Sequence, residues 1–169
     1  VLIKEGNPQA AATLAEKLTE NILVEMSAVN TNHPVVNAVL NQKFHLAREQ
    51  GTSMIFKVGD MSGMRLNEEE TVILLSNLLD NAIRECVKVV KAGRKAVIHI
   101  KLVQEDGKII FSVKNPVVEK VQITDGIVQD SNGGMHGIGL SNVKAVVDKY
   151  GGDFVISCDS EKFQAVVML

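Results

Sequence analysis

Apolar residues recur at spacings of three and four in four stretches of the chain, and each such stretch predicts an amphipathic helix. The first opens at Asn7-Pro8, where asparagine suits the N-cap and proline the first helical position. Its apolar stripe consists of Ala11, Leu14, Leu18, Ile22, Met26 and Val29. The other three are predicted to run from Asn32-His33-Pro34 to a stop at Gly51, from a capping box of Asn67 and Glu70 to Lys91, and from Gly139 to Lys149.

Five further stretches predict strands, at residues 52–58, 96–104, 108–114, 154–158 and 163–168. Glu105-Asp106-Gly107 predicts a hairpin between the second and third of them. Apolar and polar residues alternate along these two strands, so helices should cover one face of the sheet. Residues 116–136 lack periodicity and predict a long loop. The fold class that follows is a two-layer α/β sandwich with a mixed, mostly antiparallel sheet.

The first predicted helix stands apart from this sandwich. We therefore divide the chain into a helical segment at residues 1–31 and one compact domain at residues 32–169. The apolar stripe of the first helix needs a partner, which is either the rest of the domain or a dimerisation bundle. Because the chain begins at Val1 rather than Met, we interpret it as a fragment of a longer protein.

Composition narrows the functional classes. Hydrophobic residues make up 46% and charged residues 22%, which is typical of a soluble globular protein. The net charge is −2 with scattered Lys and Arg, and this disfavours a nucleic-acid groove. No apolar run approaches the ~20 residues of a membrane span, so we expect no membrane contact by this fragment. Cys86 and Cys158 have neither metal-site spacing nor disulfide density, which indicates a cytoplasmic location.

A first candidate motif lies on the long predicted helix. Asn77 and Asn81 are four residues apart, so their amides project from one face, with Asp80 beside them. Asparagine is a poor helix former, which makes the pair an unusual choice for structure alone. Carboxamide oxygens are ligands suited to Mg²⁺. The alternative is a buried asparagine pair satisfied by the backbone, and the spacing by itself favours that alternative.

A second candidate motif is the glycine-rich stretch at residues 133–140, which leads directly into the last predicted helix. Glycines let the backbone approach a ligand closely, and a helix N-terminus presents free N–H groups to phosphate. The stretch is neither a Walker loop nor a dinucleotide fingerprint, because their further residues and context are missing. Taken alone, it fits a flexible hinge equally well.

The two motifs in this order are far more specific. "NLLDNAI" followed by "HGIGLSNV" resembles the N box and second glycine box of the GHKL ATPase superfamily. "HPVVNAVLNQKFHLAREQGT" and "NLLDNAIRE" resemble its sensor histidine kinases, in the branch that serves peptide quorum sensing and citrate-type sensing. The resemblance extends from His33 to the end of the chain. It implies a Bergerat fold, ATP with Mg²⁺ as cofactors, and a lid between the glycine boxes.

The resemblance also assigns residues. Asn81 would ligate Mg²⁺, Asn77 would line the phosphate side of the site, and Arg84 matches a phosphate-contacting position, although a solvated helix charge is nearly as good an interpretation. His136 lies at the lid hinge, where a plain loop histidine is the better interpretation. The remaining residues of the implied nucleotide site are Asp80, Gly137, Ile138, Gly139 and Leu140.

The first glycine box departs from the family pattern. The usual Asp-x-Gly-x-Gly is replaced by Val113-Lys114-Asn115-Pro116-Val117. Asn115 stands where the resemblance implies an adenine-reading aspartate, and its side-chain oxygen can still accept a hydrogen bond from the adenine amino group. The lost glycines put the nucleotide affinity and the lid geometry in question.

The residue at position 77 separates kinase from hydrolase. GHKL hydrolases carry a glutamate there as general base, and an amide cannot take a proton. We therefore expect a protein histidine kinase domain rather than a hydrolase. The four histidines are followed by Pro34, Leu46, Ile100 and Gly137, and none has the acidic neighbour typical of a phosphoacceptor.

The acceptor is therefore expected upstream of this fragment. The implied partners are the dimerisation and phosphoacceptor helices of a homodimeric, membrane-anchored bacterial parent, and indirectly a response regulator. Two alternatives remain open. One is a protein-serine kinase of the anti-sigma type, which a Ser or Thr acceptor would distinguish, and the other is a nucleotide-binding regulator without catalysis.

Overall fold

A computed structural model of the chain describes residues 29–124, 127–129 and 137–169. The first predicted helix, the glycines at positions 133 and 134 and His136 lie outside these residues. No helix in the described ranges is both long and apolar enough to cross a membrane.

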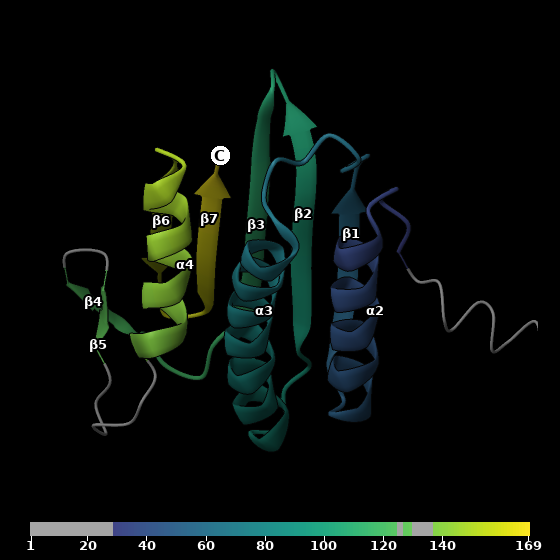
Figure 1. The fold of residues 1–169 in the computed structure, drawn as a ribbon. Helices are drawn as coiled ribbons and strands as arrows, with labels where there is room; N and C mark the ends of the chain where they lie inside the picture. The colour runs from purple at the N-terminus through teal and green to yellow at the C-terminus, as the bar shows by residue number, and fades with distance from the viewer. Residues whose placement is uncertain (1–28, 125–126, 130–136) are drawn as a thin grey trace, which may run out of the picture.

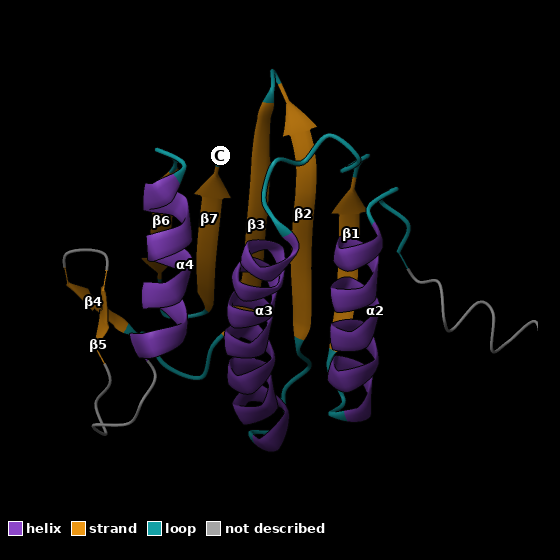
Figure 2. Cartoon of the chain, in the orientation of Figure 1, coloured by secondary structure: helices purple, strands orange, loops and turns teal. Residues whose placement is uncertain are grey.

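The described residues form a two-layer α/β sandwich, as the sequence predicted (Figures 1 and 2). A five-stranded sheet has the order β1-β2-β3-β7-β6, and three helices lie side by side on one of its faces. Only β1 and β2 are parallel; the other pairs are antiparallel. The elements are α2 (Pro34–Glu49), β1 (Ser53–Val58), α3 (Glu68–Lys91), β2 (Val97–Glu105), β3 (Lys108–Pro116), β4 (Gln122–Thr124), β5 (Ile127–Gln129), α4 (Gly137–Lys149), β6 (Asp153–Cys158) and β7 (Lys162–Met168).

The long loop predicted at residues 116–136 is wrong in part, because it contains the antiparallel strands β4 and β5. Strands of three residues are too short to show an alternation that sequence could reveal. The adjoining chain is tied to β6, since the Val121 N–H donates to Cys158 Sγ at 3.4 Å. β3 also extends two residues beyond the prediction, which places Asn115 inside the sheet, opposite Phe163 of β7. Helix α4 begins at Gly137, two residues earlier than predicted.

The helix starts follow the local signals in the sequence. The capping box of α3 is confirmed: Asn67 Oδ1 accepts from the Glu70 N–H at 2.8 Å, and Glu70 Oε2 accepts from the Asn67 N–H at 3.2 Å. Helix α2 begins at Pro34, and its N-cap is His33, whose Nδ1 accepts from the Val36 N–H at 3.4 Å. Both caps satisfy N–H groups that a helix terminus otherwise leaves unpaired.

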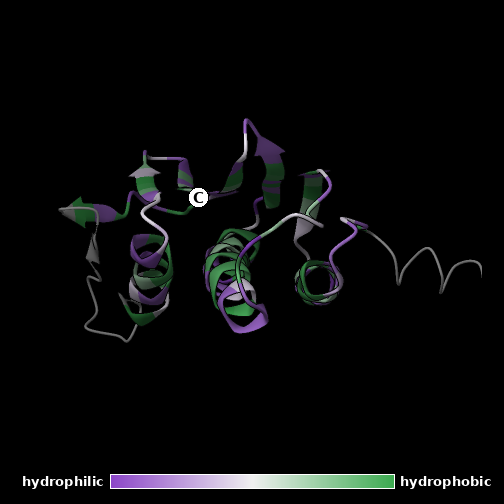
Figure 3. Cartoon of the chain, turned by 45° about the horizontal axis from the view of Figure 1, so that its top comes forward, coloured by the Kyte–Doolittle hydropathy of each residue, from purple (hydrophilic) through white to green (hydrophobic). Residues whose placement is uncertain are grey.

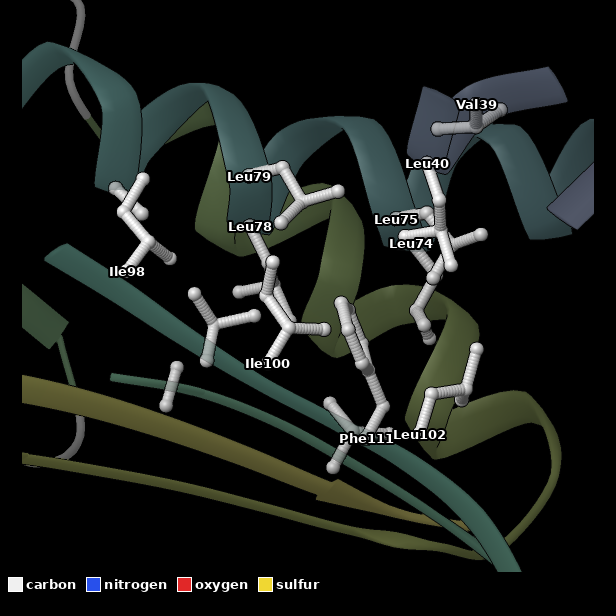
Figure 4. Packing of buried hydrophobic residues seen from close by; sticks show 14 of the residues in the cluster. Val39, Leu40, Leu74, Leu75, Leu78, Leu79, Ile98, Ile100, Leu102 and Phe111 are labelled. Atoms are coloured by element: carbon white, nitrogen blue, oxygen red, sulfur yellow. The ribbon is translucent and has the colours of Figure 1, made fainter. Parts of the chain in front are cut away.

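Helix α3 is the centre of the hydrophobic core. Its leucine stripe consists of Leu74, Leu75, Leu78 and Leu79. The stripe packs on side chains that point from β2 and β3 toward the helices (Figure 4). Leu79 of α3 and Phe111 of β3 are both 0% exposed. The buried and less buried residues of β3 alternate as the sequence predicted. The cluster drawn in Figure 4 includes Val39, Leu40, Leu74, Leu75, Leu78, Leu79, Ile98, Ile100, Leu102 and Phe111.

A polar contact holds the end of α4 against the start of α3. The buried carboxylate of Glu70 accepts hydrogen bonds from Lys149 Nζ and, at 2.5 Å, from Tyr150 Oη. The hydrogen bond from Lys149 and then that from Tyr150 hold the pKa of Glu70 below its usual value of 4.5. The same contact raises the pKa of Lys149.

This contact predicts an acid-dependent stability. Because the pKa of Glu70 is lower in the folded chain than in the unfolded chain, its contribution is complete above the unfolded pKa and is lost as the pH falls through the folded one. We expect Glu70→Gln to be less stable than the wild type at pH 7, and the difference to shrink toward pH 3. Urea denaturation at each pH measures it, with the exposed neighbour Glu69→Gln as control. A difference independent of pH would contradict the prediction.

Candidate functional site

Asn77, Asp80 and Asn81 lie half-buried on α3, on the side away from the leucine stripe. Asn77 Nδ2 donates to the Ile73 carbonyl one turn earlier, at 2.7 Å. The bond agrees with the alternative in which the backbone satisfies a buried asparagine, but it satisfies only the N–H₂ group of Asn77. Among the described residues, the Asn81 side chain has no hydrogen-bond partner. The amide oxygens of both residues are therefore available to a ligand.

The glycine-led start of α4 meets this asparagine face. A Cβ atom at Gly139 would lie 2.9 Å from Asn77 Oδ1, closer than a real Cβ approaches any heavy atom. A larger residue at this position would force the Asn77 amide to move away from the start of α4. The contact joins the two sequence motifs, which are 62 residues apart, and sets the N-terminal N–H groups of α4 beside the α3 amides.

The residues next to Gly139 point in opposite directions. Ile138 is 53% exposed, whereas Leu140 is 8% exposed and belongs to the core. A ligand at this helix end can therefore contact the side chain of Ile138 but only the backbone of Leu140.

Asn115 adds a buried polar group to the same end of the sandwich. The end of β3 and the start of α4 lie at this end (Figure 1). Asn115 is 2% exposed, and its Nδ2 donates to the Pro116 carbonyl at 2.9 Å. Its Oδ1 is buried without a partner among the described residues. An unpaired buried acceptor costs about 1–3 kcal/mol, so a ligand that donates to it would recover that free energy.

Asp80 forms an ion pair with a residue that the sequence analysis did not predict to be near it. Lys43 of α2 forms an ion pair with Asp80 Oδ1 at 2.7 Å, with the lysine side chain 11% exposed. The ion pair fixes α2 against the asparagine face of α3. A lysine on the polar side of a helix gives no sign of which acid it will meet, and the sequence therefore held no signal for it.

The other predicted site residues are placed less fully. Arg84 is exposed one turn beyond Asn81, and His136 lies outside the described residues. The described residues contain no group of three or more His, Cys, Asp or Glu side chains arranged to hold a metal ion. A cation at the asparagine face would then take its protein ligands from amides such as that of Asn81.

Burial raises the pKa of the Cys86 thiol to about 12, so this cysteine is not a nucleophile.

The chain is similar to a known protein family. Residues 66–169 match the model of a family described as the GHKL domain, and the chain belongs to this family. This match covers both asparagines of α3, Asn115 and the whole of α4. No curated protein matches the chain significantly.

Solved structures of histidine kinases share the fold. The catalytic domain of histidine kinase ThkA has a TM-score of 0.60 at 17% identity, covering 83% of this chain and 92% of that domain. Histidine kinase AdeS of Acinetobacter baumannii has a TM-score of 0.57 at 18% identity, covering 95% and 78%. Full-length ShkA in complex with AMPPNP has a TM-score of 0.58 at 18% identity, covering 79% of this chain and 28% of ShkA. At such identities the likeness establishes the Bergerat-type fold.

The Gly139–Asn77 contact predicts an energetic coupling between the two positions. Gly139→Ala should displace Asn77 Oδ1 and strain its bond to the Ile73 carbonyl, and Asn77→Ala removes the obstructing atom. The loss of unfolding free energy in the double variant should therefore be smaller than the sum of the two single losses by about 1 kcal/mol. A thermodynamic cycle from urea denaturation measures the coupling. The same cycle with the exposed Glu69→Ala, at the start of α3 and far from Gly139, in place of Asn77→Ala should be additive. Equal coupling in both cycles would contradict the contact.

Proposed function

We propose that this chain is the ATP-binding catalytic domain of a two-component histidine kinase, and that it transfers the γ-phosphoryl group of ATP to a histidine outside these 169 residues. Membership of the GHKL domain family and the likeness to histidine kinase catalytic domains support the proposal. One neighbour, ShkA, was solved with AMPPNP, an analogue of ATP. The observation that carries the proposal is the buried, unpartnered Asn115 Oδ1 at the end of the sandwich where α4 begins.

Asn115 suits the adenine end of the nucleotide. Its unpaired Oδ1 can accept a hydrogen bond from the exocyclic amino group of adenine, whereas guanine presents a carbonyl oxygen at the equivalent place. Because the Asn115 amide group is held by its bond to the Pro116 carbonyl, the acceptor is oriented before the ligand arrives. The side chain would thus favour ATP over GTP.

The start of α4 suits the phosphate end. Its first N–H groups and the positive end of its dipole favour an anion, and Gly137 and Gly139 leave the backbone accessible. Asn77 lines this end from α3, and the exposed Arg84 is long enough to reach a phosphate oxygen from the next turn. Ile138 would cover the bound nucleotide from the solvent side.

Asn81 suits Mg²⁺ because its amide oxygen is a hard ligand without a partner among the described residues. Asn81 would hold the ion, whose chemistry is the neutralisation of charge during phosphoryl transfer. Asp80 contributes indirectly: its ion pair with Lys43 fixes the helix turn from which Asn81 projects.

The chemistry is transfer rather than hydrolysis. Asn77 stands where a hydrolase needs a base, and an amide cannot accept the proton of an attacking water. In the transfer, an imidazole nitrogen forms a bond to the γ-phosphorus while the bond to the β–γ bridging oxygen breaks. ADP leaves with that electron pair, and the imidazole proton passes to solvent.

None of the histidines in the described residues suits the acceptor role. His33 caps α2 through its Nδ1, and His33, His45 and His99 are followed by Pro34, Leu46 and Ile100. The partner would be a dimerisation hairpin of a homodimeric, membrane-anchored parent, and the helical segment predicted from the sequence at residues 1–31 would adjoin that hairpin. A response regulator would then receive the phosphoryl group from that hairpin.

The unpaired Asn115 Oδ1 allows a test of its proposed hydrogen bond to adenine. Asn115→Leu should leave the melting temperature of the free protein unchanged or raised, because an unsatisfied buried oxygen is removed. The same variant should lose the rise in melting temperature that Mg-ATP causes in the wild type by mass action. Differential scanning fluorimetry with and without Mg-ATP measures both effects.

Thr52→Val is the matched control for this variant. Thr52 Oγ1 is also buried and unpartnered, but it lies at the start of β1, on the opposite edge of the sheet from β6 and the adjoining α4. Its removal should leave the Mg-ATP response intact. A wild type that responds more strongly to GTP than to ATP would contradict the role of Asn115.

Phosphotransfer tests the function itself. The chain alone should neither label itself nor release phosphate rapidly, yet it should label an added histidine kinase dimerisation hairpin with γ-labelled ATP. The label should be acid-labile and base-stable, as phosphohistidine is. Asn81→Ala should abolish labelling while Asn142→Ala leaves it unchanged. Label on His33 or His45 without a hairpin would overturn the proposal, as would a serine-linked, acid-stable product.

A further inference from the structure

The helices and strands that the structure describes leave the sheet face opposite the helices open. None of the described elements lies over it, since α2, α3 and α4 all pack on the other face (Figures 1 and 3). Period-two alternation places on the open face those strand residues that do not point into the core. In the middle strands these include the polar residues His99 and Lys101 of β2 and Ser112 and Lys114 of β3, beside the apolar Val103 and Ile110.

Cations on this face stand directly beside one another. Lys57 of β1 pairs in register with Lys101, and His99 pairs in register with Lys114. Like charges directly opposite one another destabilise a sheet. The Lys57–Lys101 pair is such a contact, and Lys114 adds a third lysine to the same face.

These side chains surround a shallow hollow of about 200 Å³. Its floor also includes Ser112 and Gln164, which are joined by a hydrogen bond of 3.2 Å from Gln164 Nε2 to Ser112 Oγ. Because the serine oxygen accepts this bond, its own O–H remains free to donate outward. The hollow thus presents cations and a hydroxyl donor, a set that favours a carboxylate.

The acids nearby neutralise this face only in part. Glu105 pairs with Lys101 at 3.1 Å, at the hairpin end of β2. Asp159 accepts two backbone N–H bonds, from Glu161 and Lys162, each at 2.7 Å. Within the described residues, Lys57 and Lys114 have no carboxylate at ion-pair distance. The whole chain carries a net charge of −2, so the face is a local reversal of the sign of the molecule.

Apolar side chains flank the cations on both edges of the sheet. Ile55 of β1 and Val155 of β6 are each 54% exposed on the open face. Four strand spacings separate β1 from β6 in the sheet order, which amounts to about 19 Å. A cationic centre with apolar flanks over this width matches a small protein interface, whereas a free anion would contact only the hollow.

We propose that the open face is a docking surface for an acidic protein partner, whose carboxylates pair with Lys57 and Lys114 while its apolar side chains pack on Ile55 and Val155. Pairing would relieve the like-charge repulsion between Lys57 of β1 and Lys101 of β2. The open-face positions of the strands carry no Phe, Tyr or Trp on which bases could stack, so a nucleic acid fits less well. The surface lies across the sheet from the nucleotide site, so it does not depend on the proposed kinase activity.

The probe is a fluorescently labelled decapeptide of alternating glutamate and leucine, with a lysine–leucine decapeptide as its charge-reversed counterpart. We expect the acidic peptide to bind the intact chain and to weaken as salt rises, and the basic peptide not to bind. Amide shifts in NMR spectra should change on β1, β2, β3 and β7. Fluorescence anisotropy measures the affinity.

The decisive variant is Lys57→Glu with Lys114→Glu, which should weaken binding of the acidic peptide at least tenfold. It should stay folded, because Lys57→Glu replaces its like-charge pair with Lys101 by an opposite-charge pair, and Lys114 has no ion pair among the described residues that its substitution would break. The matched control is Lys91→Glu with Lys144→Glu in the helix layer, which removes the same charge and should bind normally. Retained Mg-ATP stabilisation in both variants would separate this surface from the nucleotide site.

Three outcomes would overturn the proposal. The first is equal binding by the two double variants. The second is a set of shift changes confined to the helix layer. The third is displacement of the peptide by inorganic phosphate or by single-stranded DNA at lower concentration than by unlabelled peptide, which would assign the face to a small anion or to a nucleic acid.

Discussion

Burial of the α3 leucine stripe against β2 and β3 is the interaction on which the rest of the structure depends. Leu78 and Leu79 are 2% and 0% exposed, and the full burial of one such side chain contributes about 1.5–3 kcal/mol. The stripe fixes the rotation of α3 about its axis as well as its position. Asn77 and Asn81 share the helix with these leucines, and their direction is therefore set by core packing.

The candidate site is completed by groups that depend on this orientation. Gly139 can approach Asn77 only because α4 packs on the same helix, and the Glu70–Lys149–Tyr150 contact holds the opposite end of α4. Lys43 brings α2 to the same turn of α3 through Asp80. The three helices are thus joined by polar contacts on α3, while the sheet supplies Asn115 from below. A rigid arrangement of this kind keeps an unsatisfied acceptor in place for a ligand.

The two faces of the sheet contrast in chemistry although they come from the same alternating strands. The inner face carries Ile98, Ile100 and Phe111, and it is covered by helices. The outer face carries His99, Lys101 and Lys114, and the described elements leave it open. A sheet needs only one buried face for stability, so the other face is free to carry charges that folding does not require. We propose that the helix-covered side of the sheet positions a nucleotide and that the open side binds a partner.

The sequence by itself determined the elements and the face that each residue presents. Period 3.6 and the Asn67–Glu70 capping box defined α3, period two defined β2 and β3, and the four-residue spacing placed Asn77 and Asn81 together, because all these signals act over a few neighbouring residues. The tertiary structure alone decided which faces meet. It inserted β7 between β3 and β6, buried Asn115 without a partner, paired Lys43 with Asp80, and set Gly139 against Asn77. These contacts join residues far apart along the chain, and they follow from sheet order and helix packing, which no local pattern encodes.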